Sequence, residues 1–132
     1  MDANETHGSF DDILAMASPA LQPVCESLRA QVAELHADFV EIVWPNHRIA
    51  SFGVGPKKMT EHYAYIAVQN SHVNLGFYHG TSLPDPAGLL EGTGKKLLHI
   101  KIRDVSSSHS PAVIALLRAA IADRKRHAGR AW

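Results

Sequence analysis

Apolar side chains at the start of the chain follow the spacing of helices. Between residues 18 and 40 they recur every three or four positions, the spacing of one helical face. They are Leu21, Val24, Leu28, Val32, Leu35 and Phe39. Ser18 and Pro19 suit the start of this helix, and the alternative is a start at Pro23 after a looser turn, because proline is awkward deeper inside a helix. A shorter helix is predicted over FDDILAMA, with Ser9 as its N-cap.

After Asp38 the period of the apolar positions changes to that of strands. EIVW and HRIASFGV are predicted to be extended, with a break at Pro45-Asn46, and PKKMTEH is the connection that follows. HYAYIAVQ and HVNLGFYH are separated only at Asn70-Ser71, and so short a polar break predicts an antiparallel hairpin. TSLPDPAGLLEGTG is predicted to be an irregular loop with one helical turn around residues 87–90, and LLHIKIR is the last strand.

A final helix is predicted from Ser110-Pro111, with an apolar stripe and a basic close at Arg124, Lys125 and Arg126. The stripe consists of Val113, Ile114, Leu117 and Ile121. Short connections between the strands favour antiparallel pairing. The predicted fold class is therefore α+β, a single antiparallel sheet of about five strands with N-terminal helices and a C-terminal helix packed on it. Residues 1–132 are expected to form one domain, with residues 1–8 mobile.

Composition places the chain among ordinary globular proteins. Apolar residues make up 45% and charged residues 20%, and no apolar run has the length of a membrane span. The start of the chain has no signal-peptide layout, so we expect a cytoplasmic protein without a membrane partner. Cys25 is the single cysteine, which excludes an intramolecular disulfide.

The net charge of zero conceals two oppositely charged halves. Residues 1–46 contain eight acidic residues and one arginine, whereas residues 47–132 contain five acidic residues and twelve lysines or arginines, giving net charges of −7 and +7. One interpretation is that an acidic helical layer neutralises a basic sheet within the fold. The other is that the sheet presents an anion-binding surface.

The segment EGTGKKLLHIKIRD carries the most distinctive short motif. A P-loop needs four residues between its glycines and a helix after them, whereas Gly92 and Gly94 enclose one residue and lead into a strand. A Walker-type nucleotide loop is therefore excluded. A backbone anion nest beside Lys95 remains open, and the alternative is a turn that uses glycine for positive φ.

The polar side of the predicted sheet gathers basic and aromatic residues. His99, Lys101 and Arg103 alternate with the apolar residues of the last strand. If the hairpin turns its aliphatic residues inward, the same outer face receives Tyr63, Tyr65, His72 and Asn74. Such a face can hold an anionic or planar ligand. The alternative is an ordinary solvated sheet face, with the tyrosines covered by the first helix.

Catalytic and metal-binding motifs are not evident in the sequence. No histidine pair has the spacing of a helical metal site, no G-x-S-x-G elbow occurs, and Cys25 falls beside an apolar helical stripe. We therefore predict no catalytic residue, no cofactor and no assigned metal ligand. Neutral net charge and the lack of an RNP-like motif also argue against nucleic acid as a partner.

The stretch from Leu89 to Asp104 has the pattern G-x-G-K-x-x-x-H-x-K-x-R, and the segment VEIVWPNHRIASFGV lies upstream of it. These two segments resemble the YdhG-like family of bacterial domains of unknown function (domain-of-unknown-function 1801). The resemblance covers most of the chain from about Leu21. It implies a compact α+β fold related in layout to frataxin-like and YjbR-like domains. Because some relatives are described as iron chaperones, it also implies an iron-binding alternative, for which Glu34, Asp38 and Glu41 have the only helical spacing.

The leading functional hypothesis is a small non-catalytic domain that binds a small anionic molecule or a protein partner on its basic sheet face. The alternatives are a frataxin-like iron or metal chaperone and an enzyme of unknown class. A flat sheet edge or an exposed terminal apolar face would also allow a homodimer.

Overall fold

The computed structural model describes residues 8–130. Residues 1–7, which make up most of the stretch expected to be mobile, lie outside the described residues, as do residues 131–132. Gly8, the last residue of that stretch, is hydrogen-bonded to the rest of the fold: its backbone N–H donates to the carbonyl of Val43 at 3.1 Å. No helix among the described residues is both long and apolar enough to cross a membrane.

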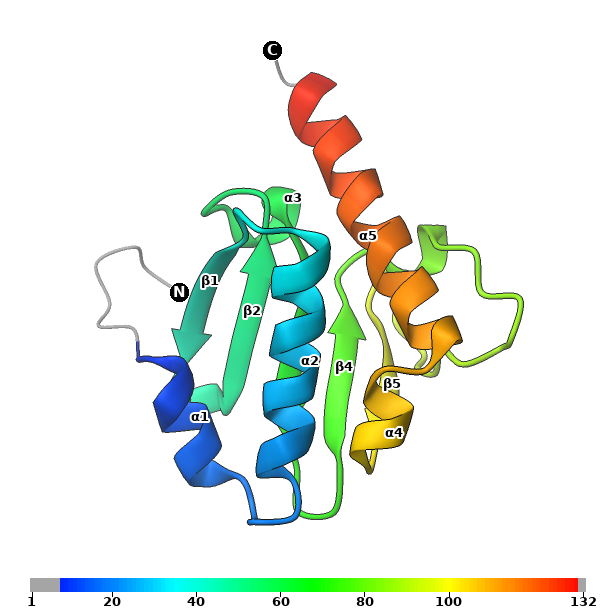
Figure 1. Ribbon diagram of the computed structural model, residues 1–132. Helices are drawn as coiled ribbons and strands as arrows, with labels where there is room; N and C mark the ends of the chain where they lie inside the picture. Colours follow the sequence, from blue (N-terminus) through cyan, green and yellow to red (C-terminus); the bar gives the residue numbers. More distant parts are fainter. Residues whose placement is uncertain (1–7, 131–132) are drawn as a thin grey trace.

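Five strands form one antiparallel sheet in the order β1-β2-β3-β4-β5, which confirms the predicted fold class (Figure 1). They are β1 (Val40–Trp44), β2 (Ile49–Gly53), β3 (His62–Val68), β4 (Val73–Phe77) and β5 (Leu98–Ile102). Each strand pairs with the next one in the sequence. The topology is therefore a meander, in which every connection joins neighbours.

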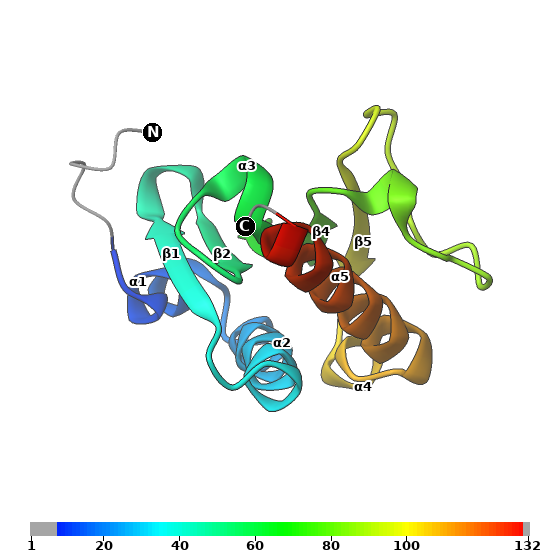
Figure 2. The same ribbon diagram turned by 90° about the horizontal axis from the view of Figure 1, so that it is seen from above.

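The longer helices cover one face of this sheet, as Figure 2 shows. They are α1 (Phe10–Met16), α2 (Gln22–Leu35) and α5 (Pro111–Arg130), and the single turn α4 (Val105–Ser108) lies beside them. The short helix α3 (Lys58–Glu61) lies at the end of the sheet, toward its other face. Helix α2 begins one residue before Pro23, so the later of the two predicted starts is correct.

The hydrophobic core lies between the sheet and this helical layer. Alternate strand residues point into it, as the two-residue period predicts, and the apolar stripes of α2 and α5 face them. Fully buried members include Phe52, Ile66, Leu75, Phe77, Ile102, Val24, Leu28, Val32 and Leu117. Burying each such side chain contributes about 1.5–3 kcal/mol relative to leaving it in water.

An ion pair on the same face ties the helices to the edge strand β1. The Arg29 side chain of α2 donates to the carboxylate of Glu41 through Nε at 2.6 Å and through Nη2 at 3.1 Å. Its guanidinium carbon also lies 4.8 Å from the ring centroid of Phe10 in α1. Glu41 is therefore a structural residue of the helical face, and α2 ends before Asp38, so Glu34, Asp38 and Glu41 do not share a helix.

Two predicted local features differ in the structure. No helix forms at residues 87–90, because the Asp85 carboxylate accepts the backbone N–H groups of Leu89 and Leu90 and holds a turn instead. A 3-10 helix, η2 (Gly80–Ser82), precedes that loop. The C-terminal helix also continues past the basic residues 124–126, which were expected to close it.

The face opposite the helices carries a close contact between neighbouring strands. Tyr65 of β3 lies directly over Gly76 of β4, its register partner, and its phenol ring fills the volume that a side chain at position 76 would occupy. Glycine at position 76 is thus required by the tyrosine ring that covers it.

We expect Gly76→Ala to destabilise the protein by about 1–3 kcal/mol, because the added methyl group displaces the Tyr65 ring. Urea denaturation monitored by circular dichroism measures the change. In the Tyr65→Ser variant, Gly76→Ala should lower the free energy of unfolding much less, because the tyrosine ring is absent. An equal cost in both backgrounds would contradict the contact as its cause.

Candidate functional site

Two rows of side chains cross the face of the sheet that the long helices leave uncovered. The register places Trp44, Ile49, Ala67, Asn74 and Lys101 in one row, from β1 to β5. The adjacent row consists of Ile42, Ser51, Tyr65, Gly76 and His99. We call this surface the open face.

At the β4–β5 side of the open face, four polar residues form what we call the basic corner: His72, Asn74, Lys101 and Arg103. Asn74 and Lys101 are register partners. The pairing of Val73 with Ile102 continues outward and places His72 beside Arg103. Lys101 and Arg103 are exposed, whereas His72 and Asn74 are half-buried. The basic corner thus combines two solvated cations with two partly covered hydrogen-bonding groups.

The covered groups of the basic corner lack partners. His72 Nδ1 and Asn74 Oδ1 are both shielded from solvent, and neither has a hydrogen-bond partner among the described residues. A shielded polar atom without a partner costs about 1–3 kcal/mol. The neighbouring acid, Asp104, is engaged elsewhere, because its carboxylate caps α4 by accepting from the Ser107 backbone at 2.7 Å, and this lowers the pKa of Asp104.

A hollow opens at the other end of the row, around β1 and β2. Trp44, His47, Ile49 and Lys58 line a volume of about 210 Å³, which we call the aromatic hollow. The turn η1 (Pro45–His47) brings His47 to this position, and Arg48 closes the turn in the left-handed conformation at φ 59°. The Arg48 side chain holds the turn by donating to the Val68 and Met16 carbonyls.

Lys58 covers the aromatic hollow from α3. Its Nζ lies 5.2 Å from the ring centroid of Trp44 and 5.9 Å from that of Tyr78, which are cation–π distances. Tyr78 in turn lies 5.2 Å from Tyr65, centroid to centroid. Basic and aromatic groups therefore meet on the open face, although mostly through residues that the sequence did not single out.

A buried hydrogen-bonded chain lies under these aromatic rings. Ser51 Oγ lies 2.5 Å from His62 Nδ1 and 2.8 Å from the Tyr78 hydroxyl, and all three side chains are buried. Burial lowers the pKa of His62 to about 4 and raises that of Tyr78 to about 12. A neutral imidazole can accept from Ser51 while Ser51 accepts from Tyr78. Because Ser51 is fully buried, these three hydrogen-bonded side chains support the open face from beneath and are not accessible to a substrate.

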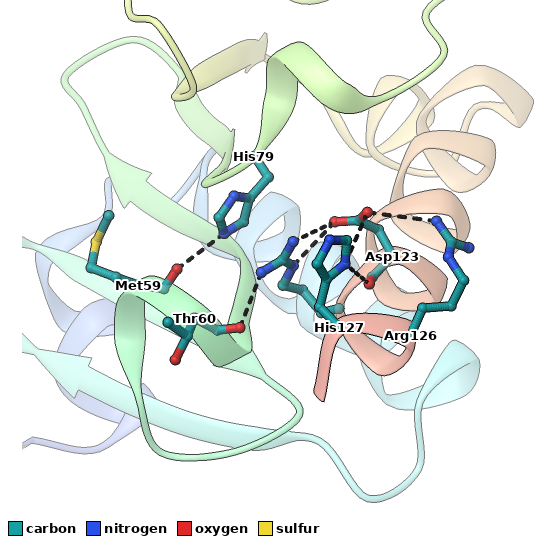
Figure 3. Close-up of polar contacts among 7 residues, drawn as sticks. Met59, Thr60, His79, Asp123, Arg126 and His127 are labelled. Atoms are coloured by element: carbon teal, nitrogen blue, oxygen red, sulfur yellow. Dashed lines mark hydrogen bonds and ion pairs between the residues drawn. The ribbon is translucent and has the colours of Figure 1, made fainter. Parts of the chain in front are cut away.

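A second polar cluster fastens α5 to the segment around α3 (Figure 3). Arg124 donates to the adjacent Asp123 carboxylate at 2.9 Å and to the Thr60 carbonyl at 3.1 Å. His79 Nε2 lies 3.1 Å from the Met59 carbonyl, and its pKa is lowered by burial and by the nearby Arg124 charge. The space among these side chains is too narrow to admit a water molecule. This cluster is therefore a structural fastening.

The structure brings together some of the predicted site residues. His72, Lys101 and Arg103 meet at the basic corner, and His99 and Tyr65 flank Gly76 in the adjacent row. Tyr63 was expected on this face, and that placement is wrong. The register shift at Phe52/Gly53 inserts an extra residue in β3, so Tyr63 turns into the helical layer, where its hydroxyl lies 2.8 Å from His36 Nδ1.

The glycine motif lies in the loop before β5, apart from the basic corner. Glu91 and His99 exchange backbone hydrogen bonds of 2.8 and 2.9 Å, which lay the loop along the outer edge of β5. Gly92 has φ +124°, a conformation that favours glycine. Thr81 Oγ1 donates to the Lys95 carbonyl at 2.9 Å, so the backbone around Gly94 and Lys95 is held against η2. The turn interpretation therefore accounts for the loop geometry.

Within the described part of the chain, no three His, Cys, Asp or Glu side chains come together as a metal site. The iron-binding alternative therefore stays a prediction without a located site.

No family model matches this chain, and no curated protein or solved structure matches it either. The resemblance to YdhG-like domains stays a prediction.

The depressed pKa of His62 makes stability depend on pH. Between the folded value of about 4 and the ordinary value of 6.5, the unfolded chain binds more protons than the folded one. The free energy of unfolding should therefore fall as the pH falls through this window, by up to about 3 kcal/mol from His62. Urea denaturation at several pH values measures it. His62→Gln should flatten the dependence and His47→Gln should not, and an unchanged slope in His62→Gln would rule out this assignment.

The cluster in Figure 3 predicts an unequal cost for two arginines of α5. The Arg124 side chain is 8% exposed and that of Arg126 is 60% exposed, although both are close to Asp123. Arg124→Ala leaves a buried carboxylate with its main partner removed and should cost about 3–5 kcal/mol. Arg126→Ala should cost less than about 1 kcal/mol. Thermal and urea denaturation compare the two, and similar costs would contradict the fastening role of Arg124.

Proposed function

We propose that the protein is a non-catalytic binding domain whose basic corner holds the phosphate or carboxylate group of a small molecule. The observation that carries this proposal is the pair of shielded, unpartnered atoms, His72 Nδ1 and Asn74 Oδ1, beside two exposed cations. Lys101 and Arg103 take part in no ion pair among the described residues. A bound anion would neutralise the two cations and accept from His72 Nδ1 when that nitrogen carries the proton, and it would accept from Asn74 once its amide is turned.

The residue types suit an anion. Arg103 can offer a planar pair of donors to two oxygens of a phosphate or carboxylate, and Lys101 supplies a compact positive charge. His72 can donate from Nδ1 in the tautomer that carries its proton there. At position 74 the amide can turn its NH₂ group toward the same place, because the orientation of an Asn amide is an assignment from the hydrogen-bond network.

The charge distribution of the fold supports the same proposal. The acidic first third supplies α1 and α2 on the covered face, whereas Lys101, Arg103, Lys58 and His47 belong to the open face or its rim. The division is partial, because five other basic residues belong to α5 on the covered face: Arg118, Arg124, Lys125, Arg126 and Arg130. At the basic corner itself a small anion meets two exposed cations, Lys101 and Arg103.

Titration with inorganic phosphate, followed by backbone amide shifts in NMR, tests the proposal. We expect saturable shifts at the amides of residues 72–74 and 101–103. The variant Lys101→Ala/Arg103→Ala should bind at least about ten-fold more weakly, since each charge-assisted hydrogen bond contributes about 1.5–3 kcal/mol.

The matched control is Lys95→Ala/Lys96→Ala, which removes the same charge from the exposed loop before β5. Its phosphate affinity should remain within about two-fold of the wild type, because Lys95 and Lys96 are not part of the basic corner and the field of exposed charges is screened by salt. An equal loss in both double variants, or no saturable shift at the basic corner in the wild type, would refute the proposal.

A further inference from the structure

We infer that the anion held at the basic corner belongs to an elongated molecule whose planar aromatic ring occupies the aromatic hollow. This inference rests on the proposed function and names the class of ligand. It is carried by the register of one row on the open face, in which Ala67 alone separates the two places.

The two places lie on a single line across the sheet. Asn74 of the basic corner and Ile49 of the aromatic hollow are both register partners of Ala67. Adjacent strands are about 4.8 Å apart, so the two positions are separated by about 10 Å. The residue between them is Ala67, so no large side chain of this row separates Asn74 from Ile49.

The aromatic hollow suits one part of a ligand better than a whole one. Its volume of about 210 Å³ is below the roughly 300–1,000 Å³ of sites that enclose a complete small molecule. Trp44 and Ile49 supply apolar walls, and Lys58 and His47 supply the polar ones. Among the described residues, no acidic side chain lines it. Trp44 is 6% exposed, so a planar ring can contact only the uncovered part of the indole, and it can meet the Lys58 ammonium there.

Together these features define the ligand by its chemistry: a planar heteroaromatic ring and a phosphate or carboxylate that are at least about 10 Å apart. A nucleoside diphosphate has this layout and serves as the probe. A single-stranded nucleic acid offers the same groups, but the small hollow accepts one ring. In the adjacent row the Tyr65 ring is already packed over Gly76 and against Tyr78. We therefore commit to a small molecule.

Fluorescence of Trp44 reports on the aromatic hollow separately from the basic corner. Trp132→Phe leaves Trp44 as the single tryptophan and serves as the background for every measurement. Adenosine diphosphate is expected to change the Trp44 emission and to bind at least ten-fold more tightly than inorganic phosphate, which should leave the emission unchanged. Lys58→Ala should reduce the affinity for adenosine diphosphate at least five-fold and leave phosphate binding unaltered.

Lys57→Ala is the matched control, because this exposed neighbour carries the same charge and is not among the residues that line the aromatic hollow. It should change neither affinity by more than about two-fold, as expected for a screened surface charge. If adenosine diphosphate binds no more tightly than phosphate and leaves the Trp44 emission unchanged, the inference is overturned while the basic corner stands.

Two further results would overturn the inference in other ways. Binding of adenosine as tight as that of adenosine diphosphate, with no phosphate binding, would refute the basic corner itself and with it the linked site. Binding of a short single-stranded oligonucleotide more than ten-fold tighter than adenosine diphosphate would replace the small molecule with nucleic acid.

Discussion

Packing of α2 and α5 against a single face of the sheet is the constraint on which the rest of the structure depends. The strands satisfy it by turning alternate residues toward the helices, and this places Ala50, Ile66 and Leu75 in one continuous core. The remaining residues of the same strands must then form a surface without a helical layer above them. Everything we assign to binding lies on that second surface.

The open face has its own small-scale packing. Tyr65 lies over Gly76, Tyr78 reaches across to Ser51, and Lys58 arches from α3 over Trp44. These contacts bury the middle of the face without a second hydrophobic layer. They leave the basic corner and the aromatic hollow at its two sides. A rigid floor of this kind keeps polar groups in fixed positions and so lowers the entropic cost of holding a ligand.

Most of the fold could be predicted from the sequence because its signals are local. The two-residue alternation in HYAYIAVQ and LLHIKIR gave the correct faces for Ile66 and Lys101, and the Ser9 and Ser110-Pro111 signals gave the correct starts of two helices. The predicted placement of Tyr63 was wrong because a bulge adds one residue to β3. No local sequence pattern marks where a strand and its partner lose register.

The site could be predicted only in part for a related reason. Lys101 and Arg103 share a strand and so share a face, which periodicity shows. The aromatic hollow joins Trp44 to Lys58, fourteen positions later, through a turn and a short helix whose direction depends on tertiary packing. Arg124 was likewise taken for a helix-closing cation, and its burial follows from contacts with the distant Thr60. The outer edges of the sheet carry one further consequence. Gly8 pairs with Val43 of β1, and Glu91 pairs with His99 of β5. Residues of the same chain therefore cover part of each edge strand, which hinders the pairing of edge strands between two copies of the protein.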